Sequence, residues 1–336
     1  MPVLVTGGAG YIGSHAVLEL LARGESVVVL DDLTTGFAWA VPPQAELVVG
    51  DVGDAAFVRR LLETRGITEI IHFAARILVA ESVADPLAYY FGNIVKTRTL
   101  IETAVAAGVE RFIFSSTAAV YGEPRVEIIG EDEPLAPINP YGRTKLASEW
   151  MLEDAARAHG LAYTALRYFN VAGADPEGRS GQSSRVATHL IKIASQVAAG
   201  VRPGLEIYGT DYPTRDGTCV RDYIHVTDLA RAHVAALERL RAGGGNLVAN
   251  CGYGRGYSVK EVVDVVKEVS GLDFPVTLAP RRPGDPACLV AAADRIRAEL
   301  GWQPILDDLP TIVRHAVAWE KALVRRKAAE AAAGAA

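Results

Sequence analysis

Runs of consecutive apolar residues alternate with stretches of helical periodicity through the first half of the chain. The apolar runs are short and lie at residues 3–5, 27–30, 47–49, 70–73, 111–114 and 162–167. Between them, apolar residues recur every three or four positions around 16–21 and at 54–64, 94–107 and 144–159. The runs predict buried β-strands and the periodic stretches predict helices. Strands that alternate with helices are typical of a parallel sheet covered on both faces.

The pattern loosens after about residue 170, where Gly-, Pro- and Ser-rich segments separate the periodic stretches. Helices are predicted again at 186–199, 226–240 and 258–269. We therefore expect an α/β protein with a Rossmann-type doubly wound parallel sheet in residues 1–172. A smaller α/β C-terminal substrate domain is expected mainly in residues 173–323, with some segments returning to the first domain. Residues 324–336 should form a frayed helical tail.

Composition narrows the function classes. Half of the 336 residues are hydrophobic and 22% are charged, which is ordinary for a globular protein. The net charge of −6 gives no reason to expect a nucleic acid or an anionic membrane as partner. No stretch of about twenty apolar residues predicts a membrane span, and no signal peptide is recognised. Three cysteines without metal-ligand spacing predict reduced thiols in a cytoplasmic protein, and no metal site is expected.

A glycine-rich turn between the first strand and the first helix predicts a dinucleotide site. Gly7, Gly10 and Gly13 allow a tight turn, a close approach to a pyrophosphate, and packing of the helix on the sheet. The N-terminus of that helix offers free N–H groups to phosphates. Asp31 ends the second strand at the expected spacing, where it would bind an adenosine ribose and repel a 2′-phosphate. Since no Arg lies at 32–36, NAD is favoured over NADP.

Two carboxylates near this turn have less specific signals. Asp32 follows Asp31 at the strand end. Asp51 follows the third strand, where it would meet the adenine, although a surface carboxylate is nearly as good an interpretation.

Tyr141 and Lys145 form the candidate catalytic pair. They are four residues apart, so on a helix they share one face. A free phenol with a pKa near 10 is a poor base at neutral pH, and a nearby ammonium favours the phenolate. Thr117 ends the strand at 111–114, at the edge of the sheet where ligands of open α/β sheets bind, and its hydroxyl is the expected relay partner. Tyr121, four residues later, is expected only to pack within a turn.

The chain resembles the extended short-chain dehydrogenase/reductases, and within them it is similar to the UDP-glucose 4-epimerase (UDP-galactose 4-epimerase) family from residue 2 to about 320. The matching segments are Thr-Gly-Gly-Ala-Gly-Tyr-Ile-Gly-Ser-His at 6–15, His-Phe-Ala-Ala at 72–75, Ser-Ser-Thr-Ala-Ala-Val-Tyr-Gly at 115–122, Asn-Pro-Tyr-Gly-Arg-Thr-Lys at 139–145, Leu-Arg-Tyr-Phe-Asn-Val-Ala-Gly at 166–173, Asp-Gly-Thr-Cys-Val-Arg-Asp-Tyr-Ile-His-Val at 216–226 and Arg-Arg-Pro-Gly-Asp at 281–285.

The resemblance implies NAD as cofactor and a UDP-sugar as substrate. With the residues above, it implies these cofactor contacts: Gly7, Gly10, Tyr11, Ile12, Gly13, Asp31, Asp32, Asp51, Val52, Phe73, Ala74, Ala75, Asn93, Tyr141, Lys145 and Phe169. It implies these substrate contacts: Thr117, Asn170, His189, Leu190, Arg221, Arg282 and Asp285. Arg221 and Arg282 would hold the diphosphate and Asp285 the uridine ribose, while helix packing is an equal alternative for His189. The chain departs from the family at Ile77, where a cofactor-binding Lys is common, at Gly92, where an Asn is usual, and at Thr117, where Ser is commoner.

The implied activity is reversible C4 epimerisation of a UDP-hexose through a 4-keto intermediate, with Tyr141 moving the O4 proton. A UDP-N-acetylhexosamine or a UDP-pentose is an alternative substrate. A dehydratase is disfavoured because Ala118 and Ala119 replace the acid and base that it needs after Thr117. A sensor that only binds NAD is disfavoured because the chain keeps the catalytic residues. A homodimer is expected through the helices at 88–107 and 144–159. The apolar residues Leu146, Trp150 and Met151 are candidates for its interface, although burial against the chain's own sheet also explains them.

Overall fold

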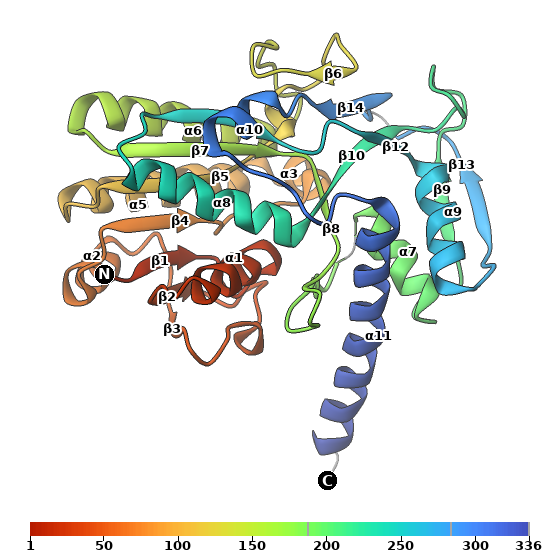
Figure 1. The fold of residues 1–336 in the computed structure, drawn as a ribbon, viewed down its shortest axis with the longest axis horizontal. Helices are drawn as coiled ribbons and strands as arrows, with labels where there is room; N and C mark the ends of the chain where they lie inside the picture. The colour runs from red at the N-terminus through yellow and green to blue at the C-terminus, as the bar shows by residue number, and fades with distance from the viewer. Residues whose placement is uncertain (187, 283, 335–336) are drawn as a thin grey trace.

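A parallel sheet of seven strands dominates the structure, a computed structural model that describes residues 1–186, 188–282 and 284–334 (Figure 1). In spatial order its strands are β11 (Leu247–Cys251), β7 (Ala162–Tyr168), β5 (Arg111–Thr117), β4 (Glu69–His72), β1 (Val3–Thr6), β2 (Val27–Asp31) and β3 (Glu46–Val49). Every residue of β1, β2 and β4 is buried, which explains why these strands are apolar almost without interruption. The predicted doubly wound α/β fold is confirmed.

Helices cover both faces of this sheet (Figure 1). One face carries α1 (Tyr11–Ala22) and α8 (Val226–Arg241). The other carries α2 (Ala55–Arg65), α5 (Lys96–Ala106) and α6 (Pro140–His159). Successive strand residues point to opposite faces of the sheet, so each strand contributes side chains to two hydrophobic cores. In β1, for example, Val3 and Val5 pack on the α1 side and Leu4 packs on the α2 side.

The order of the strands creates a crevice at the carboxyl edge of the sheet. From β1 the chain proceeds outward to β2 and β3, and then crosses back to β4 on the other side of β1 before reaching β5 and β7. At such a switch point the connections leave the strands in opposite directions. The turn after β1 and the ends of β4 and β5 therefore open onto a common space.

The remaining strands form a second unit beside the first sheet. Its larger sheet contains β12 (Gly256–Ser258), β10 (Val220–His225), β14 (Cys288–Ala291) and β6 (Ile128–Ile129), and β8 (Asn170–Ala172) pairs with β10. A two-stranded sheet joins β13 (Val276–Ala279) to β9 (Leu205–Tyr208). The helices of this part are α7 (Leu190–Ala198), α9 (Val259–Ser270), α10 (Asp294–Leu300) and α11 (Leu309–Gly334).

The two units exchange segments. Helix α8 and strand β11 return to the main sheet from the C-terminal half, and β6 joins the second unit from the N-terminal half. Of the predicted helix at 186–199, α7 covers 190–198, and residue 187 lies outside the described residues. Helix α11 projects from the molecule and continues through the predicted tail to Gly334, while residues 335–336 lie outside the described part (Figure 1).

Short elements connect the main ones. After β4 the chain forms α3 (Val79–Ala84), α4 (Pro86–Tyr89) and a π-helical turn, η2 (Tyr90–Val95), where the sequence predicts a regular helix from residue 94. The 3₁₀ turns η1 (Ala38–Ala40) and η3 (Ala118–Val120) follow β2 and β5. Among the described residues, no helix is long and apolar enough to cross a membrane.

Candidate active site

The glycine-rich turn is built so closely that side chains cannot enter it. Gly7 has a φ of +71°, and a Cβ there would lie 2.6 Å from the backbone N of Ala74. A Cβ on Gly13 would lie 2.2 Å from the carbonyl oxygen of Gly7. Gly10 begins α1 with extended backbone angles and caps it with no side chain. The first N–H groups of α1 thus lack partners within the helix, which is the arrangement that binds a phosphate.

Asp31 fixes the turn to the end of β2. Its Oδ2 accepts a hydrogen bond from the Ala9 N–H at 3.0 Å, and its Oδ1 accepts one from the Leu33 N–H at 2.9 Å. Burial raises the pKa of this carboxyl, and the two backbone bonds oppose the rise. Leu33 adopts a left-handed φ of +58°, which turns the chain sharply after the two aspartates. The carboxylate therefore anchors the turn, and it lines the same cleft as the turn's glycines.

Asp51 has a partner that sequence reasoning missed. Lys96, the first residue of α5, donates to Asp51 Oδ2 at 2.6 Å. Burial would raise the pKa of Asp51, but the Lys96 bond and the Gly53 N–H outweigh it, so the net shift is downward. Both side chains line the cleft. Only tertiary structure brings them together, because they are 45 residues apart in sequence.

Tyr141 and Thr117 meet where α6 begins beside the end of β5. Pro140 and the Asn139 side chain, which accepts the Gly142 N–H at 2.8 Å, start α6 four residues earlier than predicted. Tyr141 and Thr117 are both buried to 8% exposure. Burial raises the pKa of the Tyr141 phenol, and a hydrogen bond with the Thr117 side chain opposes this rise. Thr117 also caps the next turn, where its Oγ1 accepts the Ala119 N–H at 3.2 Å.

Lys145 lies directly behind this pair. Its Nζ donates to the Ser115 carbonyl oxygen at 2.8 Å and lies 4.9 Å from the centre of the Phe114 ring. Burial lowers the pKa of Lys145 to about 7, and the Glu149 carboxylate one turn along α6 opposes the shift. We expected the ammonium to favour the Tyr141 phenolate directly. In the structure the Thr117 side chain lowers the pKa of the Tyr141 phenol, and the effect of the Lys145 ammonium on the phenolate stays a prediction.

A buried polar network supports this end of the sheet. Arg167 on β7 binds both carboxylate oxygens of Glu149, and the Ser116 hydroxyl donates to the same carboxylate. Arg167 Nη1 also donates to the Tyr121 hydroxyl at 3.0 Å, which in turn donates to Asn250 Oδ1 at 2.7 Å. The Tyr121 side chain is 1% exposed. The expectation that its ring only packs in a turn is wrong, because its hydroxyl joins three elements.

Most of the predicted site residues line one cleft with a volume of about 910 Å³. They include the glycine turn, Asp31 and Asp32, together with Thr117, Tyr141, Phe73 and Asn170. From the second unit, Arg221 lines it and its Nη2 donates to Asp285 Oδ1 at 3.3 Å. The predicted residues in the cleft wall are Gly7, Gly10, Tyr11, Ile12, Gly13, Asp31, Asp32, Asp51, Val52, Phe73, Ala74, Ala75, Thr117, Tyr141, Phe169, Asn170, His189, Arg221 and Asp285.

Four predicted residues lie outside this wall. Asn93 is buried, and its side chain bonds to the backbone of Arg76 and to Thr144, so it holds the segment after β4 rather than facing the cleft. Arg282 is exposed, with its guanidinium 3.7 Å from the centre of the Tyr208 ring. Leu190 packs against the core where α7 begins. Lys145 is buried, with its ammonium on the Ser115 carbonyl oxygen.

Other parts of the wall carried little signal in the sequence. Residues 180–186, predicted only as loop and the edge of a helix, line the cleft, and so does Phe37 after β2. Tyr168 lines it at the end of β7 and hydrogen bonds to the Ser115 hydroxyl. Ile77 and Gly92, the two departures from the family pattern near the cofactor end, also line it. No group of three or more His, Cys, Asp or Glu side chains in the described ranges is arranged to hold a metal ion.

The residues present fit a dinucleotide. A turn that a Cβ would obstruct, an uncapped helix start and an acidic strand end lie in one wall of the cleft. That wall can take a pyrophosphate on backbone N–H groups and a ribose on Asp31.

Comparisons with known proteins agree with this geometry. Residues 3–252 match the NAD dependent epimerase/dehydratase family. A UDP-glucose 4-epimerase of Azospirillum brasilense is 56% identical over 321 residues, which cover 96% of this chain and 92% of the relative. The crystal structure of the UDP-glucose 4-epimerase from Brucella ovis in complex with NAD is 47% identical with a TM-score of 0.93, and the match covers 95% of this chain and 98% of that one.

The name of a third relative includes two sugars. The UDP-Glc/GlcNAc 4-epimerase from Campylobacter jejuni is 49% identical with a TM-score of 0.85, and the match covers 96% of this chain and 99% of that one. With the glycine turn, the acidic strand end and the Tyr141–Thr117 pair in one cleft, these matches show that the chain belongs to the NAD-dependent epimerase/dehydratase family, among relatives that are UDP-glucose 4-epimerases.

Proposed function

We propose that the chain catalyses the reversible, NAD-dependent C4 epimerisation of a UDP-hexose, interconverting UDP-glucose and UDP-galactose. The observation that carries this proposal is that Tyr141 and Thr117 line the same cleft as the dinucleotide turn and Arg221. The names of the relatives, nearly all of whose length the chain covers, support the substrate class. NAD, when bound, supplies the reversible oxidation of C4 to a ketone.

The chain's own residues supply proton transfer and orientation. Tyr141 accepts the O4 proton and returns it from its phenol oxygen, and Thr117 holds that oxygen and the sugar hydroxyl in line. Because burial alone makes the phenolate costly, a nearby positive charge would stabilise it, and the buried Lys145 lies one helical turn away. Arg221, a cation in the cleft wall, suits the substrate diphosphate.

Anchoring only the nucleotide end leaves the sugar free to turn. Ala118 and Ala119, which follow Thr117 in the cleft wall, have no polar side-chain group that could hold the sugar. A 4-keto sugar can then present either face to the same proton donor. The two alanines also weigh against a dehydratase, which needs an added acid and base at that point.

Incubating the purified protein with UDP-galactose and separating the products tests this function. We expect UDP-glucose to form, and the same final ratio to be reached from UDP-glucose. Product with a 4,6-dehydrated sugar, or no product, would overturn the proposal. UDP-N-acetylgalactosamine and a UDP-pentose, run in parallel, decide between the hexose pair and the alternative sugars.

We also propose that the chain forms a homodimer through the helical face at η2 and α6. Phe91 and Trp150 expose 59% and 56% of their surface, with the exposed Leu87 and Val95 nearby in sequence, and α6 contacts η2. An apolar patch of this kind is typical of a protein interface. Leu146, expected at this interface, is 4% exposed and packs inside the subunit, and Met151 is half-buried against the core.

The dimer is tested by light scattering on matched variants. Trp150→Glu should shift the molar mass from about two chains towards one, whereas Ile305→Glu, at an exposed residue on another surface, should leave it unchanged. A monomeric wild-type protein at micromolar concentration would refute the proposal. The cytoplasmic location, expected from three cysteines that form no disulfide with one another, stays a prediction.

A further inference from the structure

Residues 180–186, here called the strap, cross the dinucleotide end of the cleft. The Ser180 hydroxyl hydrogen bonds to the hydroxyl of Ser14, on the helix that starts at the glycine turn, at 2.7 Å. At its other end, the Arg185 guanidinium lies 5.9 Å from the centre of the Phe37 ring, on the loop after β2. All of residues 180–186, and Phe37, line the cleft. The strap thus connects the two segments that flank the glycine turn and Asp31.

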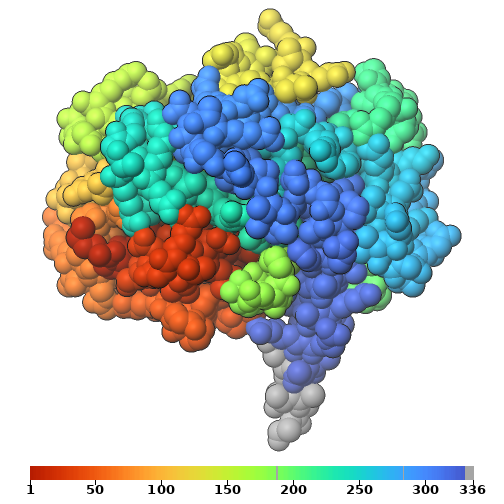
Figure 2. Space-filling model, in the orientation of Figure 1, coloured from red at the N-terminus to blue at the C-terminus, as the bar shows by residue number. Residues whose placement is uncertain are grey.

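The C-terminal helix α11 holds the strap from outside. Gly181 packs flat on the Trp319 ring, where a Cβ would lie 2.4 Å from the ring. The Trp319 ring also lies 6.1 Å from the Trp39 ring, which contacts Phe37 at 5.3 Å between ring centres. One side chain of α11 therefore packs on both segments that meet over the cleft. In Figure 2 the yellow-green region that contains the strap lies between the red N-terminal part and the blue C-terminal helix.

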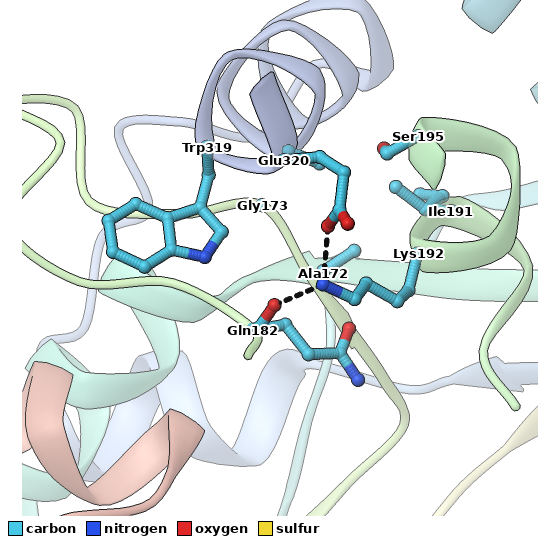
Figure 3. Close-up of a pocket in the computed structure, with 9 residues that line it drawn as sticks. Ala172, Gly173, Gln182, Ile191, Lys192, Ser195, Trp319 and Glu320 are labelled. Carbon is cyan, nitrogen blue, oxygen red and sulfur yellow. Dashed lines mark hydrogen bonds and ion pairs between the residues drawn. The ribbon is translucent and has the colours of Figure 1, made fainter. Parts of the chain in front are cut away.

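A buried ion pair completes the attachment. Lys192 on α7 and Glu320 on α11 are each 4% exposed and bind each other, beside a small cavity of about 10 Å³ (Figure 3). Lys192 Nζ donates a second hydrogen bond, to the Gln182 carbonyl oxygen of the strap. Figure 3 shows the ammonium between the carboxylate and this carbonyl.

Burying this ion pair between two helices costs free energy. Moving both charges out of water costs several kcal/mol, and apolar residues of similar size often stabilise a fold equally well. Apolar replacements could not, however, donate to the Gln182 carbonyl. The distinctive contribution of Lys192 is therefore the position of the strap, and the role of Glu320 is to keep Lys192 charged and oriented.

We propose that Trp319, Glu320 and Lys192 are positioning residues that keep the strap closed and thereby control how slowly NAD leaves the protein. The inference rests on the proposed function for NAD at the glycine turn and for a reaction that leaves its redox state unchanged. Because the reaction returns NAD to its starting redox state, a protein that retains it needs no exchange between turnovers. The three residues lie outside the Tyr141 and Arg221 region of the cleft, so the chemical step should not depend on them.

The test compares NAD release from purified holoproteins. The double variant Lys192→Met/Glu320→Leu removes the ion pair without leaving a buried lone charge. Released NAD is followed by an enzymatic cycling assay after transfer to NAD-free buffer. We expect release to be faster by about tenfold or more and the apparent KM for added NAD to rise. The kcat at saturating NAD should stay within about twofold of wild type, since a released cofactor is replaced.

The matched control is Lys267→Met/Asp273→Leu, which removes a Lys–Asp pair whose residues do not line the cleft. Its release rate should equal that of wild type. Arg185→Gln is the second test variant, and because this side chain is exposed the substitution does not endanger folding. It should also release NAD faster, by a smaller factor.

Wild-type release rates in both test variants would overturn the inference, and so would faster release in the control pair. If the double variant fails to fold, Arg185→Gln alone decides. The proposed function fails separately: a wild-type protein that retains NAD but interconverts no UDP-sugar would contradict the epimerase assignment and leave the role of the strap intact.

Discussion

At the residue scale, substitutions of Thr117 can show whether catalysis requires its hydroxyl group or only the shape of its side chain. Its Oγ1 serves both Tyr141 and the Ala119 N–H, and a serine can make the same bonds. Thr117→Ser should therefore keep kcat within about threefold, whereas Thr117→Val, which has the same shape, should lower it by about tenfold or more. Steady-state kinetics with UDP-galactose measures both. Equal kinetics in the serine and valine variants would show that the hydroxyl has no role.

For Tyr121 we predict an effect on stability rather than on activity. Tyr121→Phe keeps the buried ring but leaves Asn250 Oδ1 without its donor and removes an acceptor from Arg167. Unsatisfied buried groups cost about 1–3 kcal/mol each. We expect the free energy of unfolding to fall by about that amount, as measured by urea denaturation. A variant as stable as wild type would mean that water replaces the lost bonds.

How far single residues could be predicted depended on whether their role was local. The glycines and Asp31 follow from a turn whose geometry is dictated within 25 residues, and the structure brings them to one wall. Asn93 and Arg282 could be placed near the site, but not oriented. The direction of the Asn93 amide is set by the backbone of Arg76, and that of Arg282 by the Tyr208 ring, and neither contact has a sequence signal.

At the element scale, the glycine turn is the most demanding piece of backbone. Gly13→Ala would bring a methyl group within 2.2 Å of the Gly7 carbonyl oxygen, so α1 must shift away from β1. We expect the variant to lose bound NAD and to melt at a lower temperature, as measured by cofactor release and calorimetry. The control is Gly130→Ala, where the added methyl meets nothing within 4 Å and φ is not positive. Retention of NAD by Gly13→Ala would contradict the role of close packing.

The elements that could be predicted are those with strong periodicity. The six apolar runs all correspond to strands of the main sheet. Strands β1, β2 and β4 are buried throughout, which demands continuous apolar residues, whereas the edge strand β3 is partly exposed. The short strands β6, β8, β12 and β14 of the second unit, with two to four residues each, are not among the predicted runs. The strap could not be predicted from the sequence, because a Gly- and Ser-rich segment has no apolar periodicity. Its position depends on contacts with α1 and α11.

At the scale of the whole molecule, long-range pairing decides what local patterns cannot. Strand β11 lies beside β7, and β6 beside β14, across separations of more than 80 residues. Local sequence patterns do not state which distant strand lies beside which. A division near residue 172 therefore describes the order of the chain better than its packing.

Acid should destabilise the whole fold through its buried histidines. Burial lowers the pKa of His15 and His233 to about 4 and of His72 and His225 to about 3, against about 6.5 in an unfolded chain. Between these values the unfolded state binds more protons, so stability falls as pH falls, by about 1.4 kcal/mol per pH unit for each histidine. Burial also raises the pKa of Asp222 to about 6 and raises the pKa of Asp31 and of Glu19, and these carboxyls oppose the effect of the histidines.

Calorimetry across pH measures this effect. The melting temperature should fall steadily from pH 7 to pH 4.5. Replacing the exposed His159 by Ala should leave the pH profile unchanged. A melting temperature that is constant over this range would show that the buried histidines do not govern acid stability.

The central claim is that Tyr141 moves the O4 proton, and Tyr141→Phe tests it most directly. The variant keeps the buried ring and loses only the ionisable oxygen. Its turnover of UDP-galactose should fall by about 10²–10⁴-fold, the usual contribution of general acid–base catalysis, while bound NAD and the affinity for UDP-sugar stay near wild type. Epimerisation by Tyr141→Phe at a rate near that of wild type would mean that the chemistry belongs to another residue.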